Sequence, residues 1–196
     1  MPQLPIEGQK LLFSEARTHH SWQDKAVDEK ILRQIYDLMK WAPTSLNAQP
    51  IHIVFVVSQE AKQRLLPVLM AGNVEHTRAA AATAIIAYDI KFYEHFPKTF
   101  PAVPNMKDNF ANNAKSAESL AFRNGSLQGG YFILAARALG LDTCGMSGFN
   151  NDKLDKEFFA DGRYKSNFLC NLGYGDNKKL YPRGYRHPFD EACKII

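Results

Sequence analysis

The chain has 196 residues, of which 45% are hydrophobic and 22% are charged. This composition is typical of a soluble globular protein with one substantial core, so we expect a single domain over residues 1–196. The net charge of +4 is mild, and Lys178-Lys179 is the only adjacent Lys/Arg pair. That charge favours an anionic small molecule over nucleic acid as a binding partner.

Cysteine usage and hydropathy indicate a cytoplasmic protein. The cysteines are few, odd in number and widely spaced, and no Cys-x-x-Cys motif occurs; they are Cys144, Cys170 and Cys193. Such a set is typical of reduced thiols rather than of a disulfide framework. No apolar run is long enough for a signal peptide or a membrane span, so we expect no membrane partner.

The first predicted elements are a helix and a strand. Apolar residues recur at helical spacing over 29–41, with Asp28 as a plausible N-cap and Pro43 ending the helix from beyond. The run 51–57 (IHIVFVV) is rich in β-branched residues and predicts a buried strand.

The next stretch alternates a helix with a strand and then loses its pattern. Ser58 should cap a helix that runs to about Met70 and bends or ends early at Pro67. Residues 83–88 (TAIIAY) predict a second strand. Residues 91–110 hold several prolines among aromatic residues, and we interpret them as an aromatic excursion that is poorly suited to a sheet.

A long helix dominates the second half of the chain. Residues 111–139 are rich in alanine and predict one helix that ends at Gly140. Glycines at 125, 129 and 130 each cost about 1 kcal/mol there, so they indicate close packing of the helix or close approach of a ligand. Residues 168–173 predict a third strand before a basic, turn-rich tail. This order of elements predicts an α+β fold with a small sheet.

The run 41–50 (WAPTSLNAQP) packs two prolines, two hydroxyls and two amides between a predicted helix and a predicted strand. An ordinary turn rarely needs so many short hydrogen-bonding side chains, and the run is suited to present donors and acceptors to a polar ligand. For Pro43 and Pro50, the structural interpretation as parts of a helix-to-strand turn is the better one.

The sequence lacks the common catalytic signatures. It contains no Gly-x-Ser-x-Gly, His-Glu-x-x-His, Walker or Gly-x-Gly-x-x-Gly motif. The six histidines show no metal-ligand spacing, so we expect no metal site. If the protein is an enzyme, a bound cofactor is therefore expected to carry the chemistry.

Three further segments contain groups suited to a phosphate or a flat ring. An arginine beside a hydroxyl, as in Arg17-Thr18-His19, suits a phosphate clamp. The glycines of 144–148 (CGMSG) would let backbone N–H groups approach a flat ring. Arg183 and Arg186 belong to a basic tail. Taken singly, these segments are equally well explained as a helix end, a loop with positive φ and a solvated face.

Taken in order, RTH, APTSLNAQP, LGLDTCGMSGF and LGYG with a later arginine resemble the FMN-dependent nitroreductase family across nearly the whole chain. The stretches LMKWAPTS, AFRNGS and LGYGD are most similar to its malonic semialdehyde reductase subgroup. The resemblance implies a small, mostly antiparallel sheet flanked by helices. It also implies a long central helix at the interface of a homodimer with composite active sites.

The resemblance also implies an activity. The expected reaction is ping-pong hydride transfer through N5 of FMN, with NADH or NADPH as donor and no catalytic side chain. The expected acceptor is a small aldehyde acid such as malonic semialdehyde, which would be reduced to 3-hydroxypropionate. The alternatives are a broad nitroaromatic or quinone reductase and, more remotely, a flavin-binding protein without NAD(P)H turnover.

Matches to the family motifs give the expected cofactor-binding residues: Arg17, Thr18, His19, Pro43, Thr44, Ser45, Asn47, Asn73, His76, Gly145, Met146, Ser147, Gly148, Arg183 and Arg186. By this resemblance, residues 17–19 and Arg186 hold the phosphate and ribityl chain, with Arg183 and Lys179 as weaker phosphate candidates. Residues 43–47 reach the flavin from the partner subunit. Asn73 lies near the ribityl chain and the pyrimidine edge, and Ser147 and Gly148 face N5 and O4.

One position departs from the family pattern. His76 stands where the family often has a lysine near flavin N1 and O2, so we expect the reduction potential to depend on pH more than in a lysine-bearing relative; a partly exposed helix residue is the structural alternative. For the carboxylate of an aldehyde acid, Arg123 is the tentative ligand, although a structural salt bridge explains it equally well. The excursion at 91–110 is a plausible lid over the acceptor pocket.

Overall fold

The computed structural model describes residues 2–196 of the chain. The strands are β1 (Ile51–Val56), β2 (Ala82–Asp89), β3 (Asp142–Met146) and β4 (Tyr164–Gly173). The α-helices are α1 (Ile6–Gln9), α2 (Glu29–Met39), α3 (Gln59–Leu65), α4 (Ala71–Ala79), α5 (Phe96–Thr99), α6 (Met106–Ala111), α7 (Ala114–Ala138), α8 (Asn151–Phe158) and α9 (Phe189–Ala192). None of these helices is long and apolar enough to cross a membrane.

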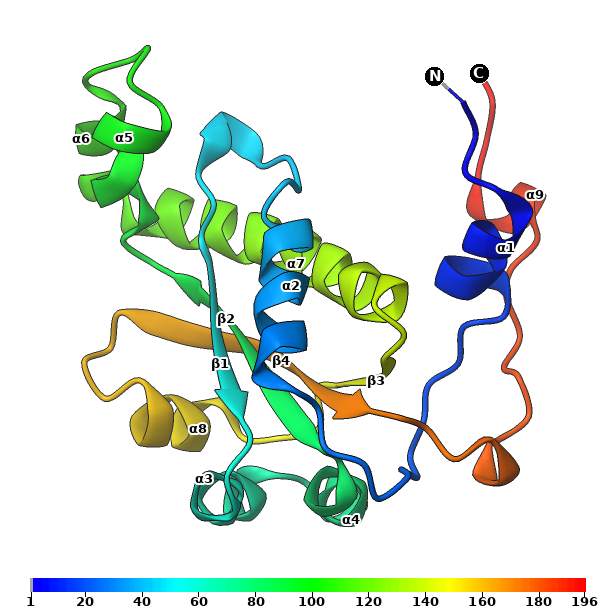
Figure 1. Ribbon diagram of the computed structural model, residues 1–196. Helices are drawn as coiled ribbons and strands as arrows, with labels where there is room; N and C mark the ends of the chain where they lie inside the picture. The colour runs from blue at the N-terminus through cyan, green and yellow to red at the C-terminus, as the bar shows by residue number, and fades with distance from the viewer. Residues whose placement is uncertain (1) are drawn as a thin grey trace.

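The four strands form one antiparallel sheet between two layers of helices, in the order β1-β2-β4-β3 (Figure 1). Every residue of β2 is buried. On one face, α2 and α7 pack through Ile35, Met39 and Phe132. On the other face, α3 and α8 contribute Leu65 and Leu154. The predicted small antiparallel sheet flanked by helices is therefore confirmed.

Helix α7 lies close against the sheet because glycine, which has no side chain, occupies two of the positions that face the sheet. A Cβ at Gly129 would lie 2.5 Å from Cε1 of Phe168, and one at Gly125 would lie 3.0 Å from Cβ of Tyr88. These contacts confirm the predicted close packing at Gly125 and Gly129, whereas a Cβ at Gly130 would have no neighbour within 4 Å among residues 2–196. The helix ends before Gly140, whose φ of 78° is strained for other residues.

Several predicted boundaries and burials were wrong. Helix α7 begins at Ala114, not at 111, because the Asn113 side chain caps it by accepting the N–H of Ser116 at 3.0 Å. Strand β1 is only partly buried, because it forms one edge of the sheet and pairs with β2 alone. Strand β4 begins at Tyr164, well before the predicted start. Helix α4 and helix α8 were missed.

The aromatic excursion forms short helices, including α5 and α6, and adds no strand to the sheet. Phe92, Phe96 and Phe110 pack against one another at ring-centroid distances of 5.4–5.8 Å. Arg163 ties the excursion to the sheet, since its Nη2 donates to Oδ2 of buried Asp89 at 2.7 Å and its Nη1 donates to Glu94. The excursion lies at the opposite end of α7 from the two chain termini (Figure 1).

Candidate functional site

Four arginines line one cavity of about 380 Å³ between the N-terminal segment, the end of α7 and the C-terminal tail; they are Arg17, Arg137, Arg183 and Arg186. Hydrogen bonds from arginine side chains to backbone carbonyls join the two terminal segments, which run side by side in Figure 1. Arg17 donates to the carbonyl of Tyr181, and Arg183 donates to the carbonyl of Ala16 at 3.4 Å. The cavity thus concentrates positive charge, and guanidinium groups suit the binding of a phosphate.

Arg137 is the arginine of this cavity that sequence reasoning missed. Its Nη1 donates to the carbonyl of Leu12 at 3.0 Å, while its Nε is buried without a hydrogen-bond partner among residues 2–196. Burial lowers the pKa of the Arg137 guanidinium. A buried, unpartnered charged donor is costly unless an anion satisfies it. The cavity therefore fits the phosphate of FMN.

The ring of His19 is buried and is not exposed to this cavity. Its ring is 3% exposed and lies so close to Gly175 that a Cβ there would be 2.1 Å from His19 Cδ2. Its Nε2 contacts Oδ1 of Asn177 at 3.1 Å. Its Nδ1 lies 3.3 Å from a carboxylate oxygen of Asp142, an ion-pair distance without hydrogen-bond alignment. The neighbouring Thr18 is exposed and bridges to Thr143.

The 144–148 segment is only partly the loop that the sequence indicated. Residues 144–146 belong to β3, and the positive φ expected for its glycines is absent from both Gly145 and Gly148. Gly148 is required for a different reason, because a Cβ there would lie 2.5 Å from Nδ2 of Asn73. That Nδ2 donates to the Gly148 carbonyl at 2.8 Å. The structure thus brings the predicted residues Asn73 and Gly148 into contact, next to the exposed Ser147.

His76 lies in a group of soft and imidazole donors. Its Nε2 is 3.1 Å from Sδ of Met146, and its ring meets the His20 ring edge-on at a centroid distance of 4.9 Å. Burial, followed by the neighbouring His20, lowers the pKa of His76, which favours the neutral ring near neutral pH. Burial raises the pKa of the adjacent Cys144 thiol to about 11. His20 also lines the four-arginine cavity.

The 43–47 segment has an unusual backbone. Leu46, Asn47 and Gln49 all have left-handed φ angles, between 44° and 55°. Such angles are strained for residues other than glycine and concentrate at functional sites. Two hydrogen bonds hold the segment: the Thr44 hydroxyl accepts from the Gln49 N–H at 3.1 Å, and Asn47 Nδ2 donates to the Thr99 carbonyl in the aromatic excursion at 2.8 Å. Pro43 and Ser45 are exposed.

The 43–47 segment and the four-arginine cavity of the same chain lie far apart. The Ser45 N–H donates to Asn124 Oδ1 at 2.8 Å, which fixes the segment to the first half of α7. Arg137 follows Asn124 by thirteen residues, or about 20 Å along a helix axis. The two groups of predicted cofactor residues are therefore not brought together within one chain.

Arg123 lines a second polar cavity of about 500 Å³, beside Ser45 and Lys115. Neither cation forms an ion pair within the part of the chain that the structure describes. No salt bridge within residues 2–196 therefore accounts for Arg123. Two unpaired cations in one cavity suit a carboxylate ligand.

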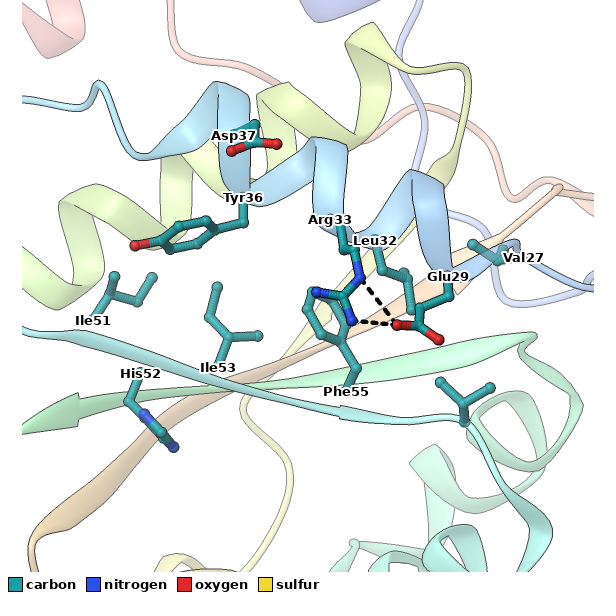
Figure 2. A pocket seen from close by; sticks show the side chains of 11 residues that line it. Val27, Glu29, Leu32, Arg33, Tyr36, Asp37, Ile51, His52, Ile53 and Phe55 are labelled. Atoms are coloured by element: carbon teal, nitrogen blue, oxygen red, sulfur yellow. Dashed lines mark hydrogen bonds and ion pairs between the residues drawn. The ribbon is translucent and has the colours of Figure 1, made fainter.

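A hollow of about 820 Å³, larger than these two cavities, contains none of the predicted site residues. It lies between α2 and the edge strand β1, where Tyr36 and Leu32 face Ile51, Ile53 and Phe55 (Figure 2). Its one arginine, Arg33, is paired with Glu29. This hollow therefore lacks the converging free cations of the other two cavities.

The antiparallel sheet between two helical layers is a nitroreductase-like fold. A crystal structure of a protein described as a "putative nitroreductase in complex with FMN", from Exiguobacterium sibiricum, matches it with a TM-score of 0.85 and 20% identity over 100% of both chains. A family model described as "Nitroreductase family" matches residues 14–174. The chain therefore belongs to the nitroreductase family.

Relatives of higher identity span almost the whole chain. A protein from Polynucleobacter asymbioticus, named "Putative NADH dehydrogenase/NAD(P)H nitroreductase", is 55% identical over 185 residues, or 94% of each chain. A protein of the same name from Rhodopseudomonas palustris is 50% identical over 193 residues, or 98% of each chain.

Proposed function

We propose that this protein is an FMN-dependent NAD(P)H oxidoreductase. The observation that carries the proposal is the four-arginine cavity, in which the buried Arg137 Nε lacks a partner. Two further facts support it: the family of the chain and the FMN bound by the Exiguobacterium protein. When bound, FMN would supply the hydride chemistry between NAD(P)H and an acceptor, and no side chain needs to act as an acid or base.

The protein's own residues would bind and orient the cofactor. Arg17, Arg137, Arg183 and Arg186 would hold the phosphate through charge-assisted hydrogen bonds. Asn73, already hydrogen-bonded to Gly148, would fix the neighbouring strand end beside the ring. The lowered pKa of His76 favours a neutral hydrogen-bond donor over the permanent charge of a lysine. The pH-dependent reduction potential expected for His76 stays a prediction.

We also propose a homodimer with composite sites. Residues 43–47 cannot reach the arginine cavity of their own chain, so they would serve the cavity of a partner in which α7 runs in the opposite direction. Uncovered large apolar side chains on α7 support this arrangement, because the exposed Leu127 and Tyr131 are one helical turn apart and lie on the same face of the helix. Apolar patches of this kind mark interaction surfaces.

For the acceptor, we propose a small aldehyde acid such as malonic semialdehyde. Arg123 and Lys115 would bind its carboxylate in the cavity that also contains the Ser45 of the 43–47 segment. The alternative, a nitroaromatic or quinone reductase, is favoured by the names of the relatives. Such an acceptor needs no carboxylate-binding cation.

The first experiment tests the cofactor and the donor. The purified protein should show flavin absorption at about one FMN per chain, and anaerobic addition of NADPH or NADH should bleach it. A colourless protein that does not bind added FMN would refute the proposal. A yellow protein that neither nucleotide bleaches would instead indicate flavin binding without turnover.

The second experiment separates the two acceptor classes. Steady-state rates with malonic semialdehyde and with a nitroaromatic compound are compared in Arg123→Ala, Lys115→Ala and the wild type. We expect KM for the aldehyde acid to rise while activity toward the nitroaromatic compound stays the same. Unchanged kinetics toward the aldehyde acid, with FMN still bound, would refute the assignment of Arg123.

A further inference from the structure

Three side chains from separate elements converge next to the four-arginine cavity. They are His20 in the segment before α2, His76 on α4 and Cys144 on β3. One potential ligand atom of each lies within 4.8 Å of the others. Residues 20, 76 and 144 are distant in sequence, so no local spacing predicts that they meet. The expectation of no metal site was based on local spacing alone and therefore did not consider this group.

We propose that His20, His76 and Cys144 form a binding site for a zinc-like divalent ion. Imidazole nitrogen and thiolate sulfur are the preferred ligands of such ions, and three protein ligands leave a fourth position open. The thioether of Met146, with its Sδ 3.1 Å from Nε2 of His76, is a further soft donor beside the group.

The distance between two of the three ligand atoms is already close to that of a tetrahedral site. Bond lengths of about 2.3 Å to sulfur and 2.0–2.1 Å to nitrogen place tetrahedral ligand atoms roughly 3.5 Å apart. Nδ1 of His20 lies 3.9 Å from Sγ of Cys144, so these two atoms need to approach by only a few tenths of an ångström. The His76 ring already lies edge-on to the His20 ring.

The surroundings limit how the side chains can move. The Trp22 indole donates to the carbonyl of His76 at 2.9 Å, which anchors this part of α4. Cys144 is paired with Asn171 in the sheet and is 1% exposed. His20 is half-buried under the ring of Tyr181, yet it lines the arginine cavity, which gives an ion a route of entry. The positive charges of the arginines disfavour a bound cation, and the negative charge of the Cys144 thiolate offsets one of the two positive charges of the ion.

The proposal has one consequence that rests on the proposed function. His20 borders the cavity in which the FMN phosphate would bind, so the ion and FMN compete for the same space. We therefore expect zinc to weaken FMN binding and FMN to weaken zinc binding by the same factor, because linkage is reciprocal.

The test uses the full-length chain freed of flavin and titrated with Co(II), which reports thiolate ligation through a charge-transfer absorption band. Zn(II) should then displace Co(II). We expect one ion per chain. Removal of a direct ligand in Cys144→Ala or His76→Gln should weaken binding by at least the roughly 10- to 100-fold loss typical of outer-shell partners. Far-ultraviolet circular dichroism of each variant checks that it is folded.

Two matched variants control for adventitious binding. Cys193→Ala removes the exposed thiol, and His52→Gln removes a partly buried imidazole on β1; both should leave the Co(II) spectrum and affinity unchanged. A wild type without the thiolate band, or a Cys144→Ala variant that keeps wild-type affinity, would overturn the proposal. If the folded Cys144→Ala variant loses the band and His76→Gln binds more weakly, the site is supported.

The coupling to FMN is measured separately, by titrating FMN with and without saturating zinc. Equal FMN affinities would overturn the competition and leave the metal site itself in place. A chain that binds zinc through Cys144 but never binds FMN would refute the proposed function alone. The two failures are therefore distinguishable.

Discussion

Replacing Arg137 with methionine should weaken FMN binding through the phosphate alone. Arg137→Met keeps most of the apolar stem of the side chain and removes the guanidinium. In the structure, Nη1 is already engaged by the Leu12 carbonyl, whereas the buried Nε has no partner. The variant therefore removes an unpartnered charged donor, together with its positive charge, from a residue that lines the cavity. A hydrogen bond to a charged group contributes about 1.5–3 kcal/mol, which corresponds to a roughly 13- to 160-fold weaker FMN affinity.

The assay compares FMN with riboflavin, which carries the same ring and ribityl chain without the phosphate. Flavin fluorescence quenching gives both dissociation constants for Arg137→Met and for the matched control Arg64→Met, whose arginine pairs with Glu157 and borders neither polar cavity. We expect Arg137→Met to weaken FMN and to leave riboflavin nearly unchanged. Equal losses for both ligands would refute a phosphate contact, because they would mean that Arg137 only positions the Leu12 segment.

Three further predictions concern stability, measured by urea denaturation. Gly129→Ala should lower the free energy of unfolding by about 1–3 kcal/mol, because the alanine Cβ would lie 2.5 Å from Phe168 Cε1. An unchanged urea midpoint would contradict close packing at this position. Burial lowers the pKa of His52, so the unfolded state binds more protons and stability should fall as the pH drops below about 6.5. His52→Gln should flatten that dependence, and an equally steep profile would contradict it. Asp89→Ala should cost about 1–3 kcal/mol by leaving Arg163 without its buried partner, and wild-type stability would show that the pair contributes nothing.

The predictable part of the fold is the part that local patterns control. The Asp28 and Ser58 side chains cap their helices as predicted, by accepting N–H groups two and three residues ahead. Gly140 ends α7 as predicted. Helix α8 was missed although its signal was present, because Asn150 caps it by accepting the N–H of Lys153. Helix α4 carried little signal, since Val74 is its only large aliphatic residue.

The candidate site was harder to predict because its members meet through tertiary contacts. Family motifs indicated Arg17 and Arg186, and the structure places both in one cavity. Arg137 stands at the end of a long helix, where an arginine is ordinary in sequence. His19 shows the opposite case, since its position in the sequence beside a predicted phosphate clamp gives no sign that its ring packs against Gly175. A position next to a predicted binding motif in the sequence therefore does not establish that the side chain faces the binding cavity.

The strained 43–47 segment connects the predicted cofactor residues to the aromatic excursion. Asn47, one of its left-handed residues, donates to the carbonyl of Thr99 in the excursion, and Gln49 donates to Asn47 Oδ1 at 2.9 Å. The Thr44 hydroxyl accepts from Gln49, whereas the exposed Ser45 hydroxyl has no hydrogen-bond partner among residues 2–196. Because the internal bonds hold this backbone in a conformation that is costly for non-glycine residues, they set the position of the Ser45 hydroxyl. A movement of Thr99 would therefore displace Asn47 and, through this backbone, change the position of Ser45.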